Sequence, residues 1–195
     1  MADRIPSWDC NPLRRQGEFD CAVDSPGSWL FCALDLRTAA DRIDWQRSPI
    51  RESERSLGLC SVYRMLMGMS MEALLKGILI AQGKQILDKG KLKNDFTTHD
   101  LSKLAHSADP SALTFSPDEI KILQNLTPYI LWAGKYPMPR LANDLIVKGH
   151  SSPEIGLERE LWDRLYEYLA RVGWVSKGHG RRLYFNGQTG STLDT

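Results

Sequence analysis

Hydrophobic residues recur at helical spacing along most of the chain between residues 25 and 173. The pattern predicts four long helices, over about 28–46, 52–82, 116–133 and 152–173, and a short helix over about 99–107. The clearest start signal is Ser116-Pro117-Asp118-Glu119, which reads as a capping box with proline at the first helical position. Amphipathic helices of this number and length favour an all-α fold, an up-and-down helical bundle.

The helix predicted over 52–82 is apolar around most of its circumference, which is typical of a helix at the centre of a bundle. Its charged exceptions, Arg64, Glu72 and Lys76, are spaced by multiples of four and therefore share one side. Four methionines between residues 65 and 71 alternate by two, so they cannot form one stripe and we interpret them as core filling. Gly83 is placed to end the helix with a left-handed cap.

Proline and glycine divide the rest of the chain. Pro128 lies inside a helical pattern, so we expect a kink or a split near Thr127. Long polar connections are predicted over 84–98 and 135–151. We therefore divide the chain into an irregular N-terminal arm (1–24), the helical bundle (25–173) and a C-terminal extension (174–195), in which a β-hairpin around Gly178–Gly180 is predicted.

Composition narrows the function classes. The 25 Lys and Arg residues nearly balance the 24 Asp and Glu residues, so no long-range field would attract nucleic acid or an anionic membrane. Cys10, Cys21, Cys32 and Cys60 lack the close pairing of metal ligands, so neither a metal nor a cofactor is predicted.

The longest uncharged run, 122–134, falls short of the roughly 18 to 20 residues that cross a membrane. With no apolar run in residues 1–9, the sequence favours a cytoplasmic protein with reduced thiols.

Three residues are weak candidates for chemistry. Glu72 and Lys76 stand four apart on the long helix, in the orientation that favours an ion pair, which we expect to be partly exposed. His99 and Asp100 open the short helix, where Asp100 can complement the positive end of the helix dipole. His99 can fold back toward Glu72 in either of two roles, as a structural hydrogen bond or as the acid or base of a catalytic site.

Three segments in order, YRMLMGMSMEALLKGILIAQG, THDLSKLA and SPDEIKILQNLTPYILWAGKYP, resemble bacterial members of the HEPN superfamily. The resemblance covers about residues 58–137. It implies an up-and-down helical bundle, usually dimeric, in a family of RNA-cleaving toxins, defence nucleases and partners of nucleotidyltransferases. The residues of these segments that match the family are Glu72, Lys76, His99, Asp100, Trp132 and Tyr136, and we expect them to form the fold first of all, because the arginine of the family's ribonuclease motif is missing here.

The catalytic HEPN members carry an arginine five to seven positions before a histidine, and this chain has none at that spacing. Lys93 stands six positions before His99, but a lysine cannot form the bidentate hydrogen bonds with which arginine binds phosphate. We therefore expect a binding or interaction module without catalysis, acting as a homodimer or with a partner protein in an RNA-related, toxin–antitoxin or defence context. The alternative is a metal-independent ribonuclease that uses His99 with Lys93 or Lys76.

A second alternative is a nucleic-acid-binding adaptor. Its candidate residues are basic and lie beside Tyr184 and Phe185; they are Lys177, His179, Arg181 and Arg182. Such a mixture can hold phosphates and stack bases, although solvated surface is the simpler interpretation. The same simpler interpretation applies to Lys135, Arg140 and Lys148.

Overall fold

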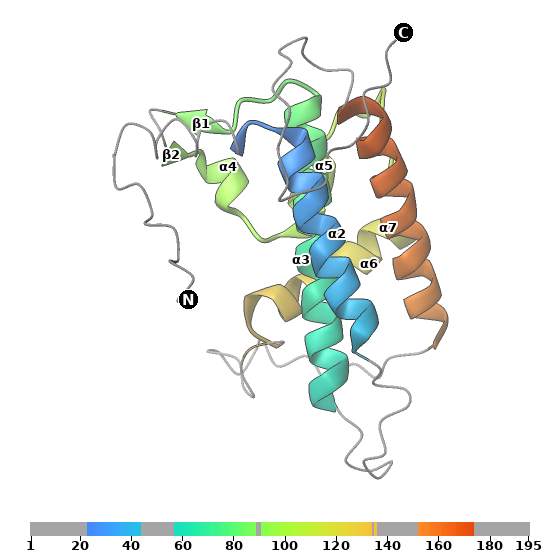
Figure 1. The fold of residues 1–195 in the computed structure, drawn as a ribbon. Helices are drawn as coiled ribbons and strands as arrows, with labels where there is room; N and C mark the ends of the chain where they lie inside the picture. Colours follow the sequence, from blue (N-terminus) through green and yellow to red (C-terminus); the bar gives the residue numbers. More distant parts are fainter. Residues whose placement is uncertain (1–22, 44–56, 89–90, 134, 136–151, 174–195) are drawn as a thin grey trace, which may run out of the picture.

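The computed structural model describes residues 23–43, 57–88, 91–133, 135 and 152–173 (Figure 1). These residues form the following elements: α2 (Pro26–Arg42), α3 (Leu57–Ala81), β1 (Leu87–Asp88), β2 (Lys91–Leu92), α4 (Asn94–Thr97), α5 (Leu101–His106), α6 (Pro117–Pro128), the π-helical turn η1 (Tyr129–Ala133) and α7 (Ser152–Gly173). The predicted all-α class is therefore confirmed. The predicted arm, the C-terminal hairpin and most of the connection over 135–151 lie outside the described residues.

Helices α2, α3 and α7 pack side by side, with α3 antiparallel to α2 and parallel to α7 (Figure 1). Ser70 of α3 joins all three, because its Oγ donates to the carbonyl of Ala33 at 2.6 Å and accepts from Trp162 Nε1 at 2.6 Å. One heptad further along α3, Gly77 approaches Trp29 and Leu169. These three helices form the central part of a helical bundle. In the described part of the chain, no helix has the length and apolar character needed to cross a membrane.

The core is built around α3, as its apolar surface predicts. Met67, Met71, Leu74 and Ile78 are completely buried, so two of the four methionines fill the core, and Met69 is partly buried against it. Gly77 allows close packing, because a Cβ there would lie 2.7 Å from Leu169 Cδ2 and 3.0 Å from Trp29 Cβ. The backbones of α2 and α7 can therefore approach α3 at this level only because residue 77 has no side chain.

The predicted helix ends are largely confirmed. Ser116 Oγ accepts from the Glu119 amide at 3.2 Å while Glu119 Oε2 accepts from the Ser116 amide at 2.8 Å, which completes the capping box. Gly83 has φ +84°, and its amide and that of Lys84 return to the carbonyls of Ile80 and Leu79 in a Schellman cap. The predicted break falls after Pro128, where α6 passes into the π-helical turn.

Three local expectations were wrong. The segment 84–98 is not merely polar connection: an antiparallel β1–β2 pair and α4 lie within it, anchored by the buried side chains of Ile86 and Phe96. Leu157, which the helical period places on the buried side of the last helix, is 45% exposed, because the buried stripe of α7 begins one residue later, at Glu158, and continues through Trp162. Leu131, placed by the α-helical period on the inner face, is 51% exposed because the wider turn after Pro128 changes that period.

Candidate functional site

The structure brings Glu72, Lys76 and His99 together. Lys76 Nζ donates to Glu72 Oε1 at 2.6 Å across one turn of α3. The expected partly exposed pair is in fact buried, since the lysine and glutamate side chains are only 7% and 11% exposed. The reason is that α2 covers this side of α3, with the Lys76 ammonium 5.8 Å from the centre of the Trp29 ring.

His99 binds the same carboxylate from outside the helix. Its Nδ1 lies 2.9 Å from Glu72 Oε2 and 3.1 Å from Oε1, so the Nδ1–H tautomer is assigned from its partner. The His99 side chain is nevertheless 51% exposed. The imidazole is thus oriented by a carboxylate through Nδ1, which leaves Nε2 as the nitrogen available to a substrate or to water.

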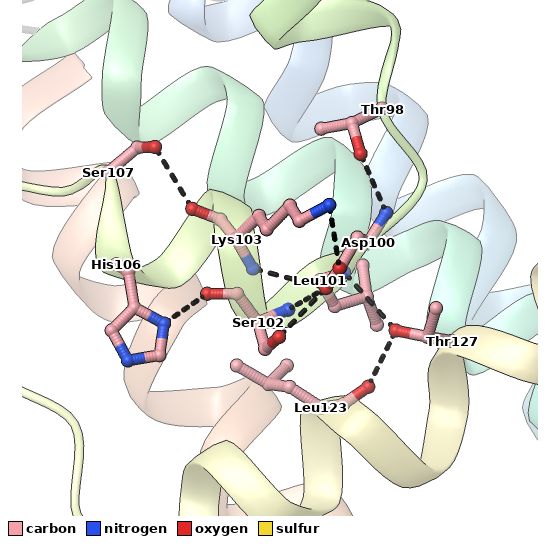
Figure 2. Close-up of polar contacts among 9 residues, drawn as sticks. All are labelled: Thr98, Asp100, Leu101, Ser102, Lys103, His106, Ser107, Leu123 and Thr127. Carbon is pink, nitrogen blue, oxygen red and sulfur yellow. Dashed lines mark hydrogen bonds and ion pairs between the residues drawn. The ribbon is translucent and has the colours of Figure 1, made fainter.

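His99 directly precedes the N-cap of α5, and Figure 2 shows the contacts that fix the start of this helix. Asp100, rather than lying within the helix, is its N-cap, and Oδ1 accepts from the amides of Ser102 and Lys103 at 3.1 and 3.2 Å. Partial burial opposes the charge of Asp100, but these hydrogen bonds outweigh it and hold the pKa of the carboxyl below its usual value. The Leu101 amide donates to Thr127 Oγ1 at 3.2 Å, which ties the helix start to α6.

Cys32 of α2 lies on the same side as the cluster. Partial burial, together with the carboxylates of Asp35 and Glu72, raises the pKa of its thiol. Cys32 is therefore protonated near neutral pH and is a poor nucleophile. In the described part of the chain, no group of three or more His, Cys, Asp and Glu side chains could hold a metal ion.

The cluster could transfer a proton through His99, but it is poorly suited to binding a phosphate group. The Lys76 ammonium is occupied by Glu72. Lys93, the other cation considered, is the N-cap of α4, so that helix separates it from His99 along the chain. The cluster of Glu72, Lys76 and His99 therefore joins α3 to the start of α5, and its exposed imidazole edge is the part that could react.

A second charged cluster was not predicted. Arg64 NH2 pairs with Glu158 Oε1 of α7 at 2.9 Å, and both side chains are only 2% exposed. The Arg64 guanidinium also lies 5.5 Å from the centre of the Tyr129 ring, and burial raises the pKa of that tyrosine. The signal available in the sequence was the position of Glu158, three and four residues before Leu161 and Trp162 on the apolar stripe of α7.

The remaining candidate residues fall largely outside the described part of the chain. These are Tyr136, Arg140, Lys148, Lys177, His179, Arg181 and Arg182, and the Trp132 side chain is likewise not described. Lys135 is exposed, as a solvated surface residue would be. Comparison of the chain with protein-family models gave no match, and neither did the comparisons with curated proteins and with solved structures.

Proposed function

We propose that the chain is a cytoplasmic helical binding module of HEPN type that associates with a second copy of itself or with a partner protein. The observation that carries the proposal is the exposure of Leu131 and Leu157, at 51% and 45%. These are the exposed large hydrophobic side chains of the described residues. Burying a fully exposed leucine contributes about 1.5–3 kcal/mol, and about half of that remains to be gained at each of these half-exposed side chains.

The two leucines lie at the same end of the bundle. Arg64 of α3 contacts both Tyr129, two residues before Leu131, and Glu158, next to Leu157. In Figure 1, η1 and the beginning of α7 lie on opposite sides of α3, both toward the end at which α3 begins. The resemblance to a family of dimeric bundles, several of them linked to RNA, toxin–antitoxin pairs or defence, supports the homodimer as the first form to test.

Sedimentation velocity on the purified chain tests this proposal. We expect the wild type to sediment with twice the mass of the chain, and Leu157→Glu to sediment as a monomer, because a carboxylate in an apolar interface is strongly disfavoured. The matched control is Gln124→Glu, which adds the same charge at an exposed position of α6. A wild type that stays monomeric at every concentration, or a Gln124→Glu variant that dissociates equally, would contradict self-association at this end.

The exposed ring of His99 favours one alternative, a metal-independent ribonuclease. A carboxylate bound to Nδ1 orients the imidazole and leaves Nε2 facing outward for proton transfer, which is the arrangement that an acid–base catalyst needs. This alternative predicts RNA cleavage that persists in a chelator and disappears in His99→Ala. The adaptor function of Lys177, His179, Arg181 and Arg182 stays a prediction from the sequence.

A further inference from the structure

A pocket of about 270 Å³ lies away from the His99 cluster, between α7 and the turn of residues 112–114 that precedes α6. Four lining residues share one face of α7, at positions 164, 167, 168 and 171. The volume is slightly below the range of roughly 300–1,000 Å³ that is typical of pockets for drug-sized ligands. The pocket therefore suits a small metabolite.

Contacts from other elements fix the walls of this pocket. Glu119 of α6 binds Arg164, with Oε1 at 3.0 Å from Nε and 2.7 Å from NH2, and the guanidinium lies 5.4 Å from the centre of the Phe115 ring. Gln82 donates to the Tyr168 hydroxyl at 3.2 Å and accepts from the Asp109 amide at 2.9 Å. The part of the wall formed by Arg164 and Tyr168 is thus in place before any ligand arrives.

The turn on the opposite wall is equally fixed. Asp109 Oδ1 accepts from the amide and the hydroxyl of Ser111 at 2.9 and 2.8 Å, and the amides of Ala112 and Leu113 return to the Asp109 carbonyl. Leu113 is buried and anchors the turn to the core. Thr114, which follows, therefore lines the pocket next to a fixed turn.

Arg171 and Glu167 are the charged lining residues left for a ligand. Arg171 lies over the Tyr168 ring at 5.8 Å, and no ion pair or hydrogen bond to another described residue occupies its guanidinium. Glu167 is exposed and has no ion pair among the described residues either. A guanidinium selects a planar or tetrahedral oxyanion, whereas a carboxylate repels that group but accepts hydrogen bonds from hydroxyls.

We propose that this pocket binds a small hydroxylated oxyanion, with the phosphate or carboxylate group on Arg171 and the hydroxyl groups on Glu167. The partial neutralisation of Arg164 by Glu119 excludes a densely charged polyanion and favours a ligand with a single anionic group. The Thr114 hydroxyl supplies a further neutral contact. The pocket is separate from the association proposed at the opposite end of α7, so each proposal can fail without the other.

Isothermal titration of the full chain tests the site with three probes: glycerol 3-phosphate, D-glycerate and inorganic phosphate. We expect saturable binding of glycerol 3-phosphate or of D-glycerate, and the tighter of the two shows whether phosphate or carboxylate is preferred. Arg171→Gln should weaken that binding by about tenfold, the loss of one charge-assisted contact. Arg42→Gln, an exposed arginine at the end of α2, is the matched control for net charge and should leave the affinity unchanged.

Glu167→Gln separates the two halves of the proposed ligand. Removing the carboxylate should tighten inorganic phosphate and reduce the preference for the hydroxylated probe over inorganic phosphate. Each variant is checked for an unchanged thermal midpoint, since both side chains lie on the surface. The proposal is overturned if none of the probes binds saturably at concentrations up to ~20 mM, or if Arg171→Gln binds like the wild type.

Discussion

Replacing Glu158 by alanine should lower the free energy of unfolding by about 3–5 kcal/mol, the typical cost of removing one partner from a buried ion pair. Glu158 and Arg64 are each 2% exposed, with 2.9 Å between Oε1 and NH2. Without the carboxylate, the guanidinium of Arg64 would remain in the core with its charge uncompensated. Urea unfolding followed by circular dichroism measures the loss.

Two further variants make this prediction specific. Glu160→Ala removes an exposed carboxylate from the same helix and should change the stability by less than about 0.5 kcal/mol. The double variant Arg64→Met with Glu158→Leu should be clearly more stable than Glu158→Ala, because no charge is left unpaired. A Glu158→Ala protein within about 1 kcal/mol of the wild type would show that the pair is not buried as described.

Gly77→Ala should lower the free energy of unfolding by about 1–3 kcal/mol through overpacking. The new methyl group would meet Leu169 at 2.7 Å and Trp29 Cβ at 3.0 Å, so α2 or α7 would have to move away from α3. This cost opposes the usual gain of replacing glycine within a helix, about 0.5–1 kcal/mol. The midpoint of urea unfolding reports the balance.

Gly156→Ala is the matched control with the opposite sign. Gly156 lies in α7, and a Cβ there would have no neighbour within 4 Å. We expect it to stabilise the protein by about 0.5–1 kcal/mol, because only the helix propensity changes. If Gly77→Ala stabilised the chain as Gly156→Ala does, the close packing of α2, α3 and α7 would be wrong.

The elements that the sequence predicted well have local chemical signals. The capping box at Ser116, the left-handed cap at Gly83 and the break at Pro128 each depend on residues within one turn. The β1–β2 pair was missed because each strand has only two residues, too few for a period. The burial of Glu72 and Lys76 was missed because it depends on α2. The spacing of residues within α3 does not indicate where α2 packs against this helix.

The candidate sites also divide into those that have a local signal in the sequence and those that depend on packing between distant segments. The contact of His99 with Glu72 could be predicted because an i,i+4 charged pair interrupts an apolar helix and a histidine returns after one loop. The Arg64–Glu158 pair joins residues 94 positions apart, and both lie on apolar stripes where charge is not expected. The pocket beside α7 is lined by the turn 112–114 and α7, and residues at the end of α3 and in α6 hold its walls in place. Because separate segments form the pocket, the pattern within any one of them does not predict it.

We propose that Glu72, Lys76 and His99 hold α3 to the start of α5 in a binding module that does not cleave RNA. The most direct measurement follows a labelled single-stranded RNA incubated in EDTA with the wild type or with His99→Ala, each verified as folded. We expect that neither protein cleaves the RNA above the buffer control. Rapid cleavage by the wild type that disappears in His99→Ala would contradict it and identify the exposed imidazole as a catalytic group.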